Sequence, residues 1–195
     1  MQHSDTPDTE RVKFLIAGGF GAGKTTFVGA VSEINPVRTE AELTAAGETV
    51  DDTTSIEAKT TTTVALDFGR RTLPGKNRDG DIVLYLFGTP GQERFWFLWP
   101  DLLRGAAGAI VIADTRRMES AFAAVDFFEQ RHVPFVVAVN RFPDSFAYSP
   151  EAVRTSLDLR SGVPVVDLDA RDEQSSIQAL IALIDHRLDS TPITV

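Results

Sequence analysis

The chain has 195 residues, of which 43% are apolar and 24% charged, and these values exclude a wholly disordered, collagen-like or repeat-array chain. Its 19 basic and 28 acidic residues give a net charge of −9, so it is a poor general binder of nucleic acid or anionic lipid. It contains no cysteine, which rules out a disulfide framework, a thiol nucleophile and a zinc–thiolate site.

Strand-like and helix-like segments alternate from the start of the chain. The apolar run Val12–Ala17 ends in glycines and predicts a buried strand, and the pattern from Thr25 to Ile34 predicts a helix. Apolar residues alternate with others across Val64–Phe68, which predicts a half-buried strand, and Asp81–Phe87 predicts a second one. Pro, Gly and Asp residues separate these two strands, so we expect a hairpin.

The second half of the chain repeats the pattern of strand and helix. The clearest helix is the last, whose apolar residues are spaced to share one face: Ile177, Leu180, Ile181, Ile184 and Leu188. Strands separated by helices of this length imply a mainly parallel sheet covered on both faces. The other predicted strands are Ala109–Ala113, Phe135–Val139 and Val163–Val166, and the helices between them lie around Ala121–Gln130 and Pro150–Leu157.

One segment does not fit this alternation. Thr39–Ala58 holds six acidic residues, no basic residue and few large apolar ones. It is too long for an ordinary connection, so we expect it to be either functional or mobile.

A phosphate-binding motif lies between the first predicted strand and the first predicted helix. Gly18–Thr25 fits G-x-x-x-x-G-K-[ST], in which glycines let backbone N–H groups surround phosphates. Lys24 would carry charge to the β- and γ-phosphates, and the Thr25 hydroxyl would be a magnesium ligand. The alternative is a glycine-rich turn that binds nothing. The predicted phosphate-binding residues here are Phe20, Gly21, Ala22, Gly23, Lys24, Thr25 and Thr26.

The segment Thr89–Phe95, TPGQERF, follows the strand that ends at Phe87. Here the chain resembles the Ras-like small GTPases, whose switch II has Asp-x-x-Gly-Gln at this place. The resemblance implies that the Gly91 N–H meets the γ-phosphate and that Gln92 orients the attacking water, with Lys24 as the second catalytic residue. The alternative for Gln92 is an exposed polar residue in a loop.

Upstream, TVALDF at Thr63–Phe68 is similar to the end of switch I in the same proteins. This match implies that Thr63 offers its hydroxyl to magnesium and its N–H to the γ-phosphate. Four threonines stand in a row, so the role could instead fall to Thr62. The other interpretation is a polar start to a strand.

From Val12 to the last helix the chain resembles one bacterial branch, the conservon-type GTPases, which are related to the gliding-motility GTPase of myxobacteria. The segments that carry the resemblance are GGFGAGKTTFVGAVSE, KTTTTVALDFGR, LYLFGTPGQERFWFLWPDLLRGA, ADTRR and PFVVAVNRF. It implies a Ras-like α/β fold with a mixed, mostly parallel six-stranded sheet. It also implies GTP or GDP as ligand, Mg²⁺ as cofactor, a partner with a roadblock/LC7 fold, and a sensor-kinase-like membrane protein.

The chain departs from the Ras-like pattern at two places. Gly88 stands where an aspartate normally holds magnesium through water, which should weaken metal binding or leave the role to another carboxylate. In the base-reading motif, Pro143 stands where the guanine-reading aspartate belongs, and Asp144 comes one residue late. The base-binding residues carried over by the resemblance are Asn140, Arg141, which would stack on the base, Asp144, Ala170, whose N–H would bind the guanine carbonyl, and Arg171.

Two further features have open interpretations. The run Phe95–Trp99 holds both tryptophans, and either it packs switch II onto the sheet or Phe95, Trp96 and Trp99 form a partner surface. Arg116 and Arg117 are either a partner or cis-arginine site or, as we prefer, a solvated helix start.

The leading interpretation is a single Ras-like G domain at residues 11–190, with a flexible N-terminus at 1–10 and a tail at 191–195. It would act as a molecular switch that hydrolyses GTP slowly without an activating partner. The alternatives are a nucleotide-binding interaction module with little hydrolysis or relaxed ATP/GTP specificity, a P-loop kinase, and a partitioning-type ATPase.

The chain start and its apolar runs predict where the protein resides. MQHSDTPDTERVKF lacks the apolar core of a secretory signal, and the longest apolar run, Gly105–Ala113, is too short for a membrane span. We expect a cytoplasmic protein that does not itself insert into a membrane, although a partner could recruit it there.

Overall fold

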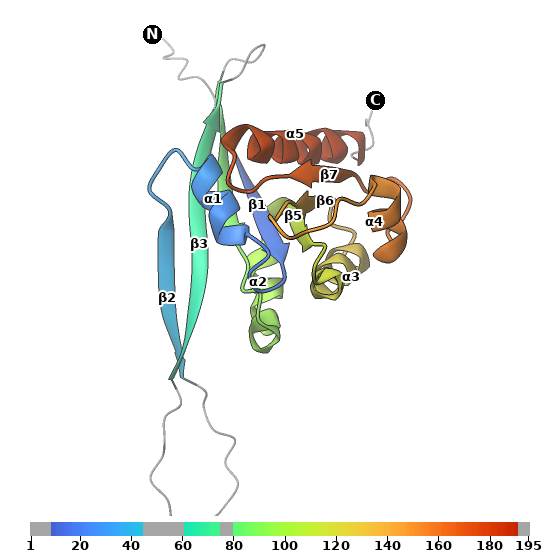
Figure 1. The fold of residues 1–195 in the computed structure, drawn as a ribbon. Helices are drawn as coiled ribbons and strands as arrows, with labels where there is room; N and C mark the ends of the chain where they lie inside the picture. The colour runs from blue at the N-terminus through green and yellow to red at the C-terminus, as the bar shows by residue number, and fades with distance from the viewer. Residues whose placement is uncertain (1–8, 45–60, 75–79, 191–195) are drawn as a thin grey trace, which may run out of the picture.

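The computed structural model describes residues 9–44, 61–74 and 80–190. Helices and strands alternate as predicted, with ends that differ by a few residues (Figure 1). Their bounds are β1 Glu10–Gly18, α1 Lys24–Val31, β2 Val37–Thr44, β3 Thr61–Leu73, β4 Ile82–Gly88, the 3₁₀ helix η1 Glu93–Leu98, α2 Trp99–Leu103, β5 Ala106–Asp114, the 3₁₀ helix η2 Met118–Ala121, α3 Phe122–Gln130, β6 Phe135–Asn140, α4 Pro150–Ser156, β7 Val165–Leu168 and α5 Glu173–Ser190.

The described strands form one seven-stranded sheet in the order β2-β3-β4-β1-β5-β6-β7. Neighbouring strands are parallel from β4 to β7, whereas β3 runs antiparallel to both β2 and β4. The mixed, mostly parallel α/β fold and the β3–β4 hairpin are therefore confirmed. The sheet has one strand beyond the expected six, because Val37–Thr44 pairs with β3 along its whole length. The rest of the acidic segment lies outside the described residues.

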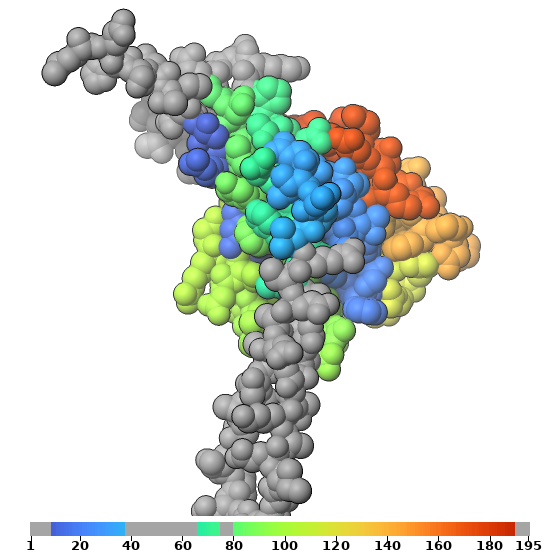
Figure 2. All heavy atoms as spheres, turned by 90° about the vertical axis from the view of Figure 1, so that its left-hand side faces the viewer, coloured from blue at the N-terminus to red at the C-terminus, as the bar shows by residue number. Residues whose placement is uncertain are grey.

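Two apolar layers cover the sheet, because successive residues of a strand point to opposite faces. Phe14 and Ile16 of β1 pack in the layer that α1 and α5 complete. Leu15 and Ala17 pack in the other layer, with α2, α3 and α4. Figure 2 views the molecule from the side of β2 and β3 and shows α1 in blue near α5 in red.

The buried face of α5 differs from the predicted one. Leu180 is buried as expected, but Ile181 and Leu188 are 40% and 62% exposed. The helix turns Ala179 and Leu183 inward instead, because its packing against β5, β6 and α1 favours that stripe. Periodicity located the helix but placed its buried stripe imprecisely.

The carboxyl ends of the parallel strands meet at one edge of the sheet. Gly18 of β1 pairs with Ile112 of β5, and Asp114 of β5 pairs with Asn140 of β6. Loops after these strands are where open α/β sheets bind ligands. Of the predicted flexible N-terminus, Glu10 already belongs to β1, whereas residues 1–8 and the tail at 191–195 lie outside the described residues. Among the helices of the described ranges, none has the length and apolarity to cross a membrane.

Candidate functional site

The phosphate loop runs from the end of β1 to the start of α1, as the motif requires. Gly23 has a φ of +112°, a left-handed conformation that favours glycine. A Cβ at this position would lie 2.5 Å from Asn140 Nδ2, so a side chain there would also displace Asn140. The Gly23 carbonyl accepts the Phe27 N–H at 2.8 Å and starts the helix. Loop conformation and helix start therefore both depend on this glycine.

Lys24 places its ammonium group inside the loop. Its Nζ donates to the carbonyls of Gly18 and Gly19, at 2.9 and 2.6 Å. Burial lowers the pKa of Lys24 from 10.5 to about 8, and the negative charge of Asp67 opposes this shift. A phosphate beside the amine would favour its charged form in the same way. The geometry thus suits the predicted role of Lys24.

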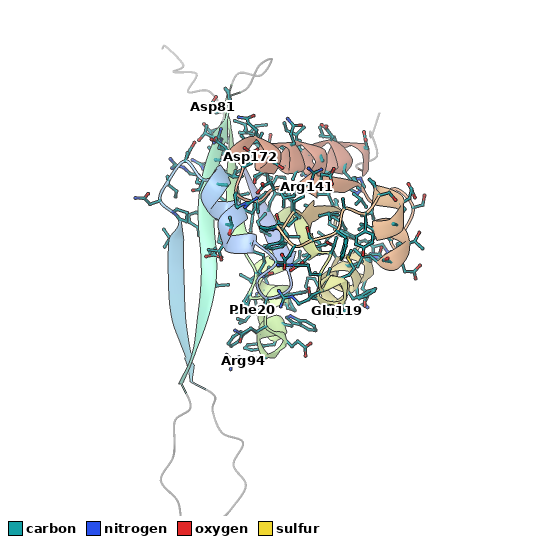
Figure 3. The ribbon with its side chains drawn as sticks, in the orientation of Figure 1. Phe20, Asp81, Arg94, Glu119, Arg141 and Asp172 are labelled. Atoms are coloured by element: carbon teal, nitrogen blue, oxygen red, sulfur yellow. The ribbon has the colours of Figure 1, made fainter. Side chains whose placement is uncertain are left out.

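A cavity of about 360 Å³ opens beside the loop and joins segments that are distant in the chain. It is lined by the phosphate loop, by Asp67 of β3 and by the loop from Thr89 to Phe95. Figure 3 labels Phe20 of the phosphate loop and Arg94 of η1, both toward the lower end of the molecule in that view. The predicted residues that the cavity brings together are Phe20, Gly21, Gly23, Lys24, Thr25, Thr26, Gly91 and Gln92. Ala22, the remaining predicted residue of the loop, is buried and packs in the apolar layer with α1 and α5.

The loop after β4 lies directly against the phosphate loop. A Cβ at Gly91 would stand 2.6 Å from Lys24 Nζ and 2.8 Å from the Phe20 nitrogen, so only glycine fits this approach. Next to it, Gln92 Oε1 accepts a hydrogen bond from Arg94 Nε at 2.9 Å. Thr63 lies in β3 as predicted, but its side chain is outside the described part of the structure, as is that of Thr62.

Asp67 is a site residue that the sequence analysis did not select. Its Oδ2 accepts a hydrogen bond from the Thr25 hydroxyl at 2.5 Å. In the β3–β4 ladder it pairs with Gly88, the position that lacks the usual aspartate. The available signal was in the sequence: residues four apart in a predicted strand are expected to share a face, and Asp67 comes four residues after Thr63. The pairing with Gly88 was not visible, because it depends on the register of the hairpin.

Thr89 is a second unselected residue. It is only 3% exposed, it lines the same cavity, and its hydroxyl has no hydrogen-bond partner within the described residues. Buried hydroxyls are usually hydrogen-bonded, so an unpaired one beside a cavity is a feature that a ligand or its water would satisfy.

Asn140 ties the predicted base-binding loops to the phosphate loop. Its Nδ2 donates to the Ala22 carbonyl at 2.9 Å, and its Oδ1 accepts the Ala170 N–H at 3.0 Å. The Ala170 N–H, which the resemblance assigns to the guanine carbonyl, is therefore already engaged in this structure. Asn140 is 4% exposed, so it acts as a buried tie between three loops.

The charged residues around the base-binding loops form pairs with one another. Arg116 donates to both oxygens of the buried Asp114 and, at 2.8 Å, to Asp144 Oδ1, while its guanidinium covers the Phe142 ring. Arg141 pairs with Asp167 instead of standing free to stack on a base. Arg171 pairs with Asp169, and its hydrogen bonds lower the pKa of that carboxyl to about 2. Asp144 would need to leave Arg116 to read guanine.

The preferred interpretation of Arg116 and Arg117 as a solvated helix start needs correction. Arg116 is hydrogen-bonded to Asp114 and Asp144. Burial would raise the pKa of Asp114, but the hydrogen bonds from Arg116 outweigh this effect and lower it. Arg117 Nη2 donates to the Phe20 carbonyl at 2.9 Å and so contacts the phosphate loop from outside. Both arginines therefore support the loops around the cavity.

The expected partner surface at Phe95, Trp96 and Trp99 also needs correction. Phe95 and Trp99 are 6% and 3% exposed. Trp99 packs in the apolar layer with α3, whereas Phe95 lines the cavity. The Trp99 indole N–H donates to the Pro90 carbonyl at 3.1 Å, and its ring packs on Trp96 and edge-on to Phe127. The exposed aromatic residue of the run is Phe97. Packing thus explains most of this segment.

A phosphate loop after the first strand, a Gly-Gln loop against it and a mixed sheet define a P-loop nucleotide-binding protein of Ras-like architecture. A family model described as "Conserved hypothetical ATP binding protein" matches residues 16–190. The chain belongs to this family.

Comparison with curated proteins places the chain near Ras-related proteins. It is 28% identical over 130 residues to Ras-related protein RABD1 of Arabidopsis thaliana, which covers 62% of each chain. It is also 28% identical over 144 residues to Ras-related protein RIC1 of Oryza sativa subsp. japonica, which covers 68% of this chain and 69% of the other. An uncharacterized protein of Methanocaldococcus jannaschii, MJ1339, is 25% identical over 134 residues, covering 68% and 71%. These matches support membership of the Ras-like GTPase superfamily.

Proposed function

We propose that this protein is a nucleotide-dependent switch that binds GTP and hydrolyses it slowly. The observation that carries the proposal is the contact between the Gly-Gln loop and the phosphate loop. Gly91 lies so close to Lys24 Nζ that a γ-phosphate held by the lysine must meet or move this loop. The GDP-bound and GTP-bound states would then differ in the conformation of the loop around Gly91 and of η1, which follows it.

The described residues suit this chemistry. Backbone N–H groups of the phosphate loop and Lys24 would hold the β- and γ-phosphates, and Gln92 would orient the attacking water. Magnesium, when bound, neutralises charge between these phosphates, and the Thr25 hydroxyl with Thr63 would hold it. The oxygens of Thr25 and Asp67, together with the Thr89 hydroxyl that has no hydrogen-bond partner among the described residues, fit a hard cation.

Guanine is the base that we propose, on the strength of the Ras-related relatives. A second candidate, relaxed ATP/GTP specificity, is favoured by one contact: Arg116 holds Asp144, the nearest substitute for the guanine-reading carboxylate. A site that lacks such a carboxylate discriminates poorly between the bases. The family description, which names ATP, agrees with this second candidate.

A competition experiment separates the two candidates. We expect unlabelled GTP and GDP to displace fluorescently labelled GDP at least about tenfold more effectively than ATP and ADP, about 1.4 kcal/mol of discrimination. Asp144→Ala should reduce this preference if Asp144 reads the base, and Asp126→Ala, at an exposed position of α3, is the matched control. Equal displacement by adenine and guanine nucleotides would favour relaxed specificity.

The two tryptophans should report the nucleotide state without a label. Trp99 is hydrogen-bonded to the Pro90 carbonyl, one residue before Gly91, and Trp96 packs on Trp99. We expect intrinsic fluorescence to differ between the GDP and GTP-analogue complexes, because a shift at Gly91 is transmitted through Pro90. Trp99→Phe should remove most of the difference. Identical spectra in both states would contradict the switch.

The partners implied by the resemblance remain part of the proposal. A roadblock/LC7-fold protein would contact the exposed Phe97 of η1 and the exposed Phe20 of the phosphate loop, which are 62% and 65% exposed. A sensor-kinase-like membrane protein would recruit the complex. A useful switch requires that the partner bind the two nucleotide states with different affinities.

A further inference from the structure

We propose that Asp67 supplies the magnesium-site carboxylate, and that this carboxylate has moved from β4 to the neighbouring strand β3. The inference rests on the proposed nucleotide-binding function and goes beyond it by assigning a residue. Ras-like proteins have the carboxylate at the position of Gly88, which here has no side chain.

The register of the sheet places Asp67 where a residue-88 side chain would project. Asp67 and Gly88 are paired across the β3–β4 ladder. A Cβ added to Gly88 would lie 3.1 Å from Asp67 Cβ and 3.2 Å from Asp67 Oδ2. The Asp67 side chain thus fills the space of the missing one. Two acidic side chains would crowd each other here, whereas one acid and one glycine fit.

Asp67 also contacts the other expected ligand. The Thr25 hydroxyl, the metal ligand of the phosphate motif, donates to Asp67 Oδ2 at 2.5 Å. Neighbouring oxygen ligands around an octahedral Mg²⁺ lie about 2.9 Å apart, so these two oxygens are close to the spacing that a shared cation needs. The carboxylate can act directly or through a metal-bound water, since Mg²⁺ usually keeps several waters.

A second observation comes from a different residue. The Thr89 hydroxyl is buried, lines the same cavity as Thr25 and Asp67, and is unpaired among the described residues. A hydrated cation at this place would offer it a partner.

The competing explanation is that Asp67 only positions Thr25 and Lys24 in the phosphate loop. The two explanations differ in their magnesium dependence. A metal-holding carboxylate affects nucleotide retention only when Mg²⁺ is present, whereas a positioning residue affects it equally with and without the metal.

The test measures dissociation of fluorescently labelled GDP, and of labelled ADP in parallel, across a range of free Mg²⁺ concentrations. For Asp67→Asn we expect the half-effective Mg²⁺ concentration to rise at least about tenfold, with the dissociation rate in EDTA within about twofold of the parent. Asp81→Asn, at the other end of the hairpin (Figure 3), is the matched control and should behave as the parent.

A relocation variant makes the test stricter. Asp67→Ala combined with Gly88→Asp returns the carboxylate to β4 and removes the crowding, so we expect it to recover Mg²⁺ dependence to within about threefold of the parent. An unchanged Mg²⁺ dependence in Asp67→Asn, or an equal loss with and without Mg²⁺, would overturn the proposal. If the parent retains neither labelled nucleotide, the proposed function itself fails, and that result is distinct.

Discussion

Replacing Lys24 with alanine is expected to abolish tight nucleotide binding. The lysine Nζ sits among the phosphate-loop carbonyls at 2.6 and 2.9 Å, and no other lysine lies in the loop. In the complex, losing about two charge-assisted hydrogen bonds from this ammonium to phosphate oxygens, at about 1.5 kcal/mol each, would cost about 3 kcal/mol of binding free energy. This corresponds to a loss of at least about 100-fold in affinity for labelled GDP, measured by fluorescence titration.

The control for this variant is Lys13→Ala. Lys13 lies in β1, the strand that leads into the phosphate loop. Its Nζ donates to the Arg104 carbonyl, away from the cavity. We expect parental affinity for Lys13→Ala. Since burial lowers the pKa of Lys24 and disfavours its charge, Lys24→Ala should not lower the melting temperature. If Lys24→Ala binds labelled GDP as tightly as the parent does, the phosphate-loop assignment is wrong.

Replacing Gln92 with leucine is expected to preserve nucleotide binding and to slow hydrolysis. The side chain lines the cavity beside Gly91, and its Oε1 is held by Arg94 at the start of η1. Leucine has no group that can orient water, and loss of such a group costs about 100-fold or more in rate. Phosphate release in a single turnover of bound GTP measures this effect.

Glu93→Gln is the matched control for Gln92→Leu, because Glu93 is the next residue and is exposed. It should hydrolyse GTP at the parental rate. If Gln92→Leu also hydrolyses GTP at that rate, then Gln92 is not the catalytic residue. A parent that binds GTP but releases no phosphate would instead favour the interaction module.

Local sequence patterns predicted most of the fold. The strands of the parallel core are apolar runs of ordinary length, and the Gly18–Thr25 motif marks a strand–loop–helix unit by itself. The extra strand β2 was missed, because Val37–Thr44 is polar and its pairing with β3 is a long-range contact. The stripe of α5 was misplaced because Ala179 is small and carries little weight in a hydrophobic pattern.

The site was predicted less completely than the fold. The phosphate loop and Gly91 follow from motifs in which spacing alone fixes the geometry. Motifs do not predict which side chains pair or pack together. The hydrogen bond from Arg116 to Asp144 and the burial of Trp99 both depend on side chains that are distant in sequence. Asp67 was missed for the same reason, since only the register of two strands reveals what lies beside Gly88.

The pairing of Asp67 with Gly88 also constrains how such a site can change over time. Because a Cβ at Gly88 would lie 3.1 Å from Asp67 Cβ, an acid gained on β4 before the acid on β3 becomes smaller would crowd Asp67. The reverse order leaves a chain with neither carboxylate. Conversion between the two arrangements must therefore pass through either a crowded or an acid-free ancestor. The two positions should accordingly be inherited as a pair, with one acid and one small residue, across members of the family.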